Sequence, residues 1–120
     1  MDFDPPSVAR LEGDSVLERI SRAHEDAVDV YTARANESAV AENAYLRVFQ
    51  IAYVQARLAK VPVTILKLEC NNDPDVCAAL QAWNLAVAAE KSARAKASEL
   101  ENRQTAAMSR QRFVREGTGG

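Results

Sequence analysis

Hydrophobic residues recur every three or four positions along most of the chain, the spacing that places them on one face of an α-helix. One such stripe covers residues 16–30, a stronger one covers residues 45–56, and a third begins at residue 76. Between the first two, residues 33–43 are polar or small. The pattern therefore predicts helices and leaves open whether one helix continues through residues 33–43 or is interrupted there.

Prolines and glycines set the expected boundaries of these helices. Residues 14–61 and 75–116 contain neither of them, so each stretch is free of helix breakers. Pro62 disfavours a helical residue before it and predicts an end near residue 60. Asp73 followed by Pro74 is a strong start signal, because Asp caps a helix and Pro suits its first position.

Together these signals predict an all-α fold, an elongated helical hairpin of two long helices joined by a short helical connector. Ser15 and Glu18 form a capping box that predicts the first start near residue 14. The predicted parts are an extended amino-terminal arm (1–13), a single helical domain (14–116) made of a helix (about 14–60), a connector (61–73) and a helix (about 74–116), and a disordered tail (117–120).

The composition indicates a thin hydrophobic core. Only 3 Phe, 3 Tyr and 1 Trp occur in 120 residues, although 48% of the chain is apolar. Beyond residue 88 much of that fraction is alanine, which buries little area. We therefore expect self-association into a homo-oligomer through the alanine-rich end, and expect Leu100→Asp or Met108→Asp to disrupt it.

Charge is distributed unevenly along the chain. The net charge of −2 does not by itself indicate a polyanionic partner. Residues 91–115, however, hold seven Lys and Arg against two Glu, a local excess of +5. Such a stretch either tracks a phosphate backbone or forms a solvated helix face, and both interpretations stay open at this point.

Candidate catalytic and metal-binding residues are scarce. The single histidine, His24, is flanked by acids on a polar face and is expected to be exposed, with no nucleophile beside it. Cys70 and Cys77 lack the spacing and companions of a zinc site, which favours partly buried free thiols. We expect no enzyme activity, no metal and no cofactor.

Two further patterns bear on function. Tyr45, Phe49 and Tyr53 recur every four residues and could stack single-stranded bases, although core packing is the favoured interpretation. No apolar run approaches the roughly 20 residues of a membrane span, and no signal-peptide pattern opens the chain. A cytoplasmic location without membrane contact is therefore expected.

The segments AENAYLRVFQIAYVQARLAKVPVT, DPDVCAALQAWNLAVAAEK and SELENRQTAAMSRQRFVRE together resemble the UvsY-like recombination mediator proteins of phages. They also resemble a broad set of short phage proteins with an arginine-dotted final helix. The resemblance covers roughly residues 41–115. Its most specific pieces are Ala56-Arg57-Leu58 just before the connector and Asp75-Val76 followed by Leu80-Gln81-x-Trp83.

The resemblance implies rings of several subunits that bind single-stranded DNA. Such proteins help to load a RecA-class recombinase onto strands covered by single-strand-binding protein. A basic pair before the connector contributes to strand binding in that family. Arg57 matches its second member, whereas Gln55 replaces the first, which shifts the expected DNA contacts toward other cations. The expected DNA-binding residues are Arg57, Lys60, Arg103, Arg110, Arg112 and Arg115.

The leading hypothesis is thus a phage recombination accessory protein, located in the host cytoplasm if a phage encodes it. Its partners would be single-stranded DNA, a RecA-class recombinase, single-strand-binding protein and further copies of itself. The alternative is a non-enzymatic protein-binding module that acts through its helical faces, such as a phage inhibitor of a host factor or an assembly chaperone.

Overall fold

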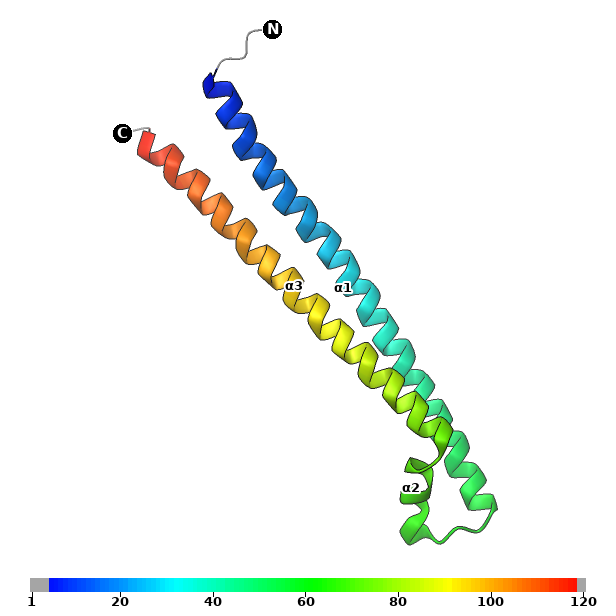
Figure 1. Ribbon diagram of the computed structural model, residues 1–120. Coiled ribbons are helices and arrows are strands. Elements are labelled where there is room, and N and C mark those ends of the chain that lie inside the picture. Colours follow the sequence, from blue (N-terminus) through cyan, green and yellow to red (C-terminus); the bar gives the residue numbers. More distant parts are fainter. Residues whose placement is uncertain (1–4, 119–120) are drawn as a thin grey trace. The chain divides into compact units, whose positions relative to one another are not determined.

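In the computed structural model the backbone is described for residues 5–118 and the side chains for residues 15–115. This part of the chain forms three helices, α1 (Pro5–Leu58), α2 (Val63–Asn71) and α3 (Pro74–Thr118) (Figure 1). No strand occurs among the described residues. The prediction of an all-α chain with two long helices joined by a short helical connector is confirmed.

Both long helices extend beyond their predicted outer limits. α1 begins at Pro5, so the prediction of an extended arm is wrong for residues 5–13, while residues 1–4 lie outside the described part. Proline is compatible with a first helical turn, whose N–H groups have no partner within the helix. α3 ends at Thr118, so the predicted disordered tail is wrong for residues 117–118, and residues 119–120 are not described.

The polar stretch at residues 33–43 does not interrupt α1, which resolves the alternative left open by the sequence. Arg34 forms an ion pair with Glu37 at 2.9 Å, three residues along the same helix. Ser38 faces inward with 7% of its surface exposed. Small inward residues and an ion pair between neighbouring turns are both compatible with an α-helix. The weak hydrophobic stripe at residues 33–43 therefore does not interrupt α1.

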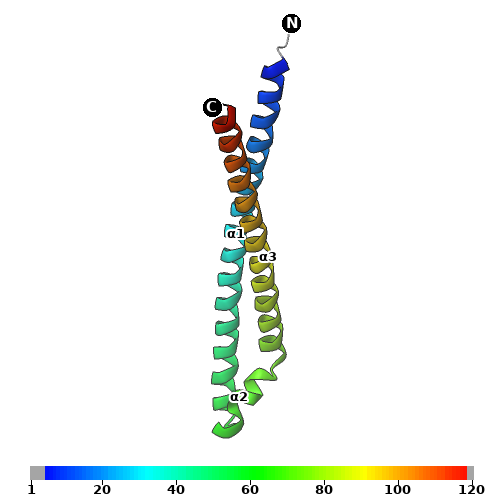
Figure 2. The same cartoon turned by 90° about the vertical axis from the view of Figure 1, so that its left-hand side faces the viewer.

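The long helices each contribute to two compact units. The terminal unit comprises Met1–Tyr31 and Ala93–Gly120, and the hairpin unit comprises Thr32–Ser92. Within the hairpin unit, the end of α1 and the start of α3 lie side by side, with α2 between them in the chain (Figures 1 and 2).

The core of the hairpin unit is small and lies where all three helices meet. Cys70 and Val76 are each 1% exposed and form a cluster with Ala52. Tyr45 stacks on Trp83 with ring centroids 5.4 Å apart, and Tyr45 also packs against that cluster. Three further residues of α1 pack against the cluster, Val48, Phe49 and Ala56.

On α3, the inward-facing residues of both units follow a spacing of alternating three and four, the 3.5-residue repeat of coiled-coil packing. Many of the inward positions on α3 are alanine, which lets two helices approach closely. The buried or half-buried positions of α3 include Ala79, Trp83, Ala86 and Glu90 in the hairpin unit and Ala93, Ala97, Leu100, Gln104, Ala107 and Gln111 in the terminal unit.

The start of α3 follows the predicted capping geometry. The Asp73 carboxylate Oδ1 accepts hydrogen bonds from the backbone N–H groups of Asp75 at 2.9 Å and Val76 at 3.3 Å. These N–H groups have no partner within the helix. The cap therefore fixes the first turn of α3 and, with it, the buried Val76.

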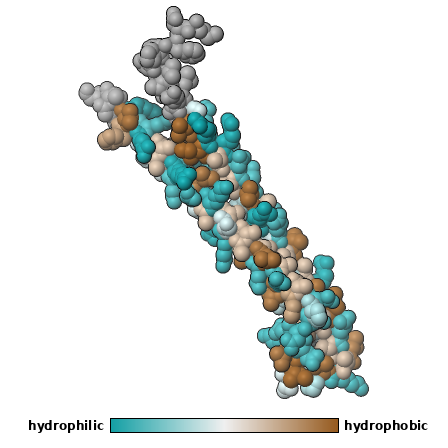
Figure 3. All heavy atoms as spheres, viewed as in Figure 1, coloured by the Kyte–Doolittle hydropathy of each residue, from teal (hydrophilic) through white to brown (hydrophobic). Residues whose placement is uncertain are grey.

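Most large hydrophobic side chains remain on the surface. Across residues 15–115, five hydrophobic residues are buried, two of them alanines, whereas seventeen large hydrophobic residues are exposed. On the face drawn in Figure 3, hydrophobic residues are interspersed with hydrophilic ones rather than hidden. The expectation of a thin core is confirmed, and single chains leave considerable apolar surface in contact with water.

We expect Val76→Ala to lower the free energy of unfolding by about 2 kcal/mol, because it removes two buried methyl groups from a closed cluster. Val63→Ala is the control, since Val63 is 86% exposed and should change stability by less than about 0.5 kcal/mol. Urea unfolding followed by circular dichroism measures both. Equal shifts for the two variants would contradict this assignment of the core.

Candidate nucleic-acid interface

The six cations predicted to bind DNA are divided between the two units. Arg57 lies in the last turn of α1 and Lys60 lies two residues beyond the end of that helix, both in the hairpin unit. All six side chains are exposed. The other four, Arg103, Arg110, Arg112 and Arg115, lie on α3 in the terminal unit. The predicted residues therefore form at least two local sets, each with its own geometry.

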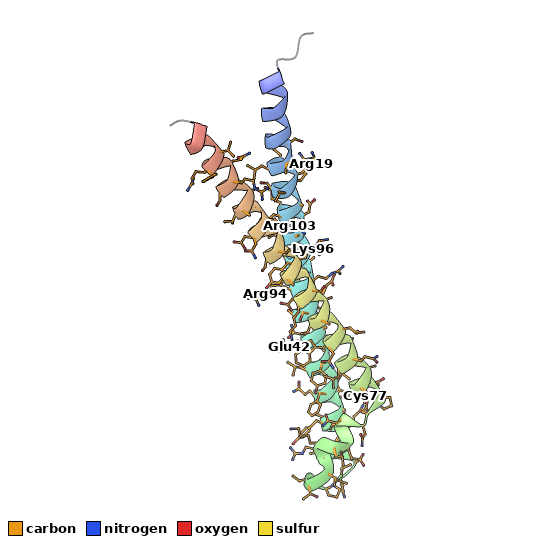
Figure 4. All side chains as sticks on the ribbon, turned by 60° about the vertical axis from the view of Figure 1, so that its left-hand side comes forward. Arg19, Glu42, Cys77, Arg94, Lys96 and Arg103 are labelled. Atoms are coloured by element: carbon orange, nitrogen blue, oxygen red, sulfur yellow. The ribbon has the colours of Figure 1, made fainter. Side chains whose placement is uncertain are left out.

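Within the terminal unit, Lys96, Arg103 and Arg110 form what we call the basic ridge. These residues are seven apart, which places them about two turns and roughly 10 Å from one another along one side of α3. Figure 4 shows Lys96 and Arg103 on the same side of the helix and Arg94 on the opposite side. Helical geometry places Arg112 with Arg94, away from the ridge.

The charges of the ridge are only partly neutralised. Arg103 Nη2 lies 2.6 Å from Glu99 Oε1, and both side chains are well exposed, at 64% and 60%. Within the described residues, Lys96 and Arg110 form no ion pair. Because an exposed ion pair contributes little stability, Arg103 can exchange Glu99 for another anion at small cost.

Sequence reasoning missed two residues of this region. Lys96 was not selected, although its seven-residue spacing to Arg103 would have placed it on the ridge. Phe113 was also missed, and 77% of its surface is exposed close in sequence to Arg110 and Arg112. An exposed aromatic ring beside cations can stack a nucleic-acid base.

Contact between the α1 and α3 segments of the terminal unit includes a polar side-chain pair. Gln104 Nε2 donates a hydrogen bond to Ser21 Oγ at 2.9 Å in a partly buried position. Gln104 belongs to the inward spacing of α3, and the ridge residue Arg103 directly precedes it. This bond fixes the rotation of α3 against α1 and thereby keeps the basic ridge to one side of the contact.

Lys60 has an unusual backbone conformation at the end of α1. Its φ of 61° lies in the left-handed region. The N–H of Lys60 bonds to the carbonyl of Arg57 at 3.0 Å, and that of Val61 bonds to Ala56 at 3.1 Å. This pair of bonds is the Schellman arrangement, in which the left-handed position usually holds glycine. The helix ends at Leu58, two residues before its predicted end.

The aromatic ladder of α1 serves the core rather than a ligand. Tyr45 and Phe49 pack against the buried cluster of the hairpin unit, with their ring centroids 6.1 Å apart. Tyr53 is 37% exposed and is therefore a surface residue. The favoured core interpretation is confirmed for Tyr45 and Phe49, which cannot stack bases while they pack there.

Other candidate groups give no further site. The prediction that His24 is exposed is wrong. His24 is half-buried, because it falls on the inward spacing of α1 near the buried Ala27. Cys70 and Cys77 are both free thiols, but the predicted partial burial is wrong, because Cys70 is buried and Cys77 is exposed. The described residues contain no cluster of His, Cys, Asp or Glu suited to a metal ion.

Within residues 5–118, no helix is both long and apolar enough to cross a membrane.

Comparison of the chain with protein-family models, with curated proteins and with solved structures gives no match in any of the three. The resemblance to UvsY-like mediators, including the matching of Arg57, therefore stays a prediction.

Lys60→Gly should raise the free energy of unfolding by about 1 kcal/mol, because glycine adopts the left-handed conformation without the steric cost of a Cβ atom. Lys60→Ala is the matched control, since it removes the same charge and keeps Cβ. Urea unfolding of both variants separates the backbone effect from the charge effect. If the two variants have the same stability, backbone strain at residue 60 is excluded.

Proposed function

We propose that this protein is a phage-type accessory protein of homologous recombination, which binds single-stranded DNA as a homo-oligomer and helps to load a RecA-class recombinase onto strands covered by single-strand-binding protein. In this proposal the chain performs no chemical step. The protein holds the DNA strand until the recombinase takes its place on that strand.

The observation that carries the proposal is the basic ridge of Lys96, Arg103 and Arg110. Two of its three cations form no ion pair within the described residues, and the third has an exposed partner that is easily exchanged. Cations spaced regularly along one side of a helix match the repeating charge of a phosphate backbone. Phe113 supplies an exposed ring nearby that can stack on a base.

Homo-oligomerisation supports the same function in two ways. Repeating the ridge in several subunits multiplies the number of phosphate contacts on one strand, which raises the overall affinity without any change in the contacts that each subunit makes. Assembly also gives partners to the apolar side chains that a single chain leaves exposed. For Met108, 52% of the surface is exposed, so Met108→Asp tests assembly. Leu100 is half-buried within its own unit and is a poorer probe.

The ridge variant Lys96→Gln/Arg103→Gln/Arg110→Gln should bind single-stranded DNA more weakly. The slope of log affinity against log salt should become shallower by about 2, because each contact to a single strand contributes roughly 0.7. Fluorescence anisotropy of a labelled oligonucleotide at several salt concentrations measures both quantities. Phe113→Ala should weaken binding with little change in that slope, since stacking releases few counterions.

Two matched variants show which cations matter. Arg57→Gln/Lys60→Gln removes the predicted cations of the hairpin unit, and Arg19→Gln/Arg34→Gln removes exposed cations of α1 outside the predicted set. The proposal requires the second pair to bind like the wild type. Absence of salt-sensitive binding by the wild type at micromolar protein would end it. Recombinase loading is then measured as DNA-dependent ATPase activity on strands covered by single-strand-binding protein.

The exposed apolar side chains also favour a second candidate function, a non-enzymatic module that binds another protein through its helical faces. Leu58 is 78% exposed and Val63 is 86% exposed, and both lie near the α1–α2 connection of the hairpin unit. This candidate includes a phage inhibitor of a host factor and an assembly chaperone. It predicts a monomer or dimer that is indifferent to nucleic acid, whereas the first candidate requires DNA binding.

A further inference from the structure

The hairpin unit carries a second regularly spaced stripe on α1, apart from the one that packs inward. Its members alternate at four and three residues and all are exposed, including Val40 at 68% and Ile51 at 52%. They lie within about 80° of one another around the helix, and the stripe is centred about 110° from the inward face. We call this set the outer stripe: Ala33, Glu37, Val40, Ala44, Arg47 and Ile51.

This spacing is the one that the chain already uses to pack α1 against α3. A helix with two 3.5-residue stripes separated in this way contacts two neighbouring helices, as in a four-helix bundle. Among the described residues of the hairpin unit, no helix covers the outer stripe, because its members are exposed. Any helix that packs on the stripe therefore comes from outside the unit.

The two charges in the stripe indicate which helix this is. Glu37 and Arg47 have opposite sign and lie within an otherwise apolar or small set. Arg47 is exposed and forms no ion pair within the described residues. Glu37 contacts Arg34 on the same helix, with 56% of the Glu37 side chain exposed. A complementary partner therefore offers a carboxylate opposite Arg47 and a cation opposite Glu37, because the exposed Glu37–Arg34 pair can be exchanged at small cost.

A second copy of the same stripe meets that requirement in the antiparallel direction. With the two-fold axis at residue 42, Glu37 of each copy faces Arg47 of the other, so both charges are paired at once. The same register places Ala33 opposite Ile51 and Val40 opposite Ala44, so each large side chain meets a small one. A parallel arrangement in register would instead place Glu37 against Glu37 and Arg47 against Arg47.

We propose that the outer stripe is a homodimer interface, at which the α1 helices of two copies pack antiparallel and pair Glu37 with Arg47 in both directions. The two hairpin units then form a four-helix bundle. This inference deepens the assembly part of the proposed function and rests on it, and it is independent of how DNA is bound.

Charge reversal tests the register. Glu37→Arg and Arg47→Glu, each alone, place like charges opposite each other twice per dimer and should weaken dimerisation roughly tenfold or more. The double variant Glu37→Arg/Arg47→Glu restores opposite charges and should dimerise like the wild type. An equimolar mixture of the two single variants should form heterodimers, because each then supplies what the other lacks. Sedimentation equilibrium measures all four samples.

Two control variants separate the stripe from the rest of α1. Glu42→Arg makes the same change as Glu37→Arg on the opposite side of the helix and should leave dimerisation unchanged. Ile51→Asp should abolish dimerisation, whereas Leu46→Asp should not, although both residues are 52% exposed. Circular dichroism of each variant confirms that helix content is retained. Salt weakens the wild-type dimer less than it weakens DNA binding, because most of this interface is apolar or small.

Each outcome decides the matter. A wild type that stays monomeric at high concentration, or single variants that dimerise as well as the wild type, overturns the proposed interface. Loss of dimerisation in both Leu46→Asp and Ile51→Asp also overturns it. If the dimer forms and responds to charge reversal but binds no DNA in the anisotropy assay, the interface stands and the proposed function fails. If the protein binds DNA as a monomer, the DNA-binding part of the proposed function stands, whereas its homo-oligomer and this interface fail.

Discussion

Close packing between α1 and α3 through small residues is the contact on which the rest of the structure depends. The inward positions repeat every 3.5 residues, and on α3 many of them are alanine. Such a contact brings two helices near each other but buries little hydrophobic area per residue. Among the described residues, the buried hydrophobic side chains larger than alanine, Leu66, Cys70 and Val76, all lie in the hairpin unit. The stability of the fold is therefore concentrated where α2 joins the two long helices.

The same shortage of buried area explains how the charged residues are arranged. A helix with a narrow inward stripe leaves most of its circumference exposed, and charged residues can occupy the remainder without loss of packing. On α3 this freedom allows Lys96, Arg103 and Arg110 to lie along one side while Arg94 lies on the other. On α1 it allows Glu37 and Arg47 to lie within a second stripe. The basic ridge and the outer stripe belong to different units, so each can be altered separately.

Much of the fold followed from local signals in the sequence. The start of α3 was predictable because Asp73 and Pro74 act through short-range geometry. The start of α1 was not, because the capping box at Ser15 is also compatible with a helix interior and Pro5 suits a first turn. Lys60 was predicted as a cation but not as a left-handed residue, because a non-glycine Schellman position has no clear sequence signal. The site was predictable as a basic stretch, whereas its division into two units was not, because that depends on contacts between distant residues.

The two thiols have a consequence for following the molecule in solution. Cys70 is 1% exposed within the core cluster, whereas Cys77 is exposed and its Sγ lies 3.0 Å from the carbonyl oxygen of Asn71. A thiol reagent can reach Cys77 in the folded protein but reaches Cys70 only when α2 separates from α1 and α3. The labelling rate of Cys70 therefore reports how often α2 separates from α1 and α3 under native conditions, and no cysteine has to be introduced to measure it.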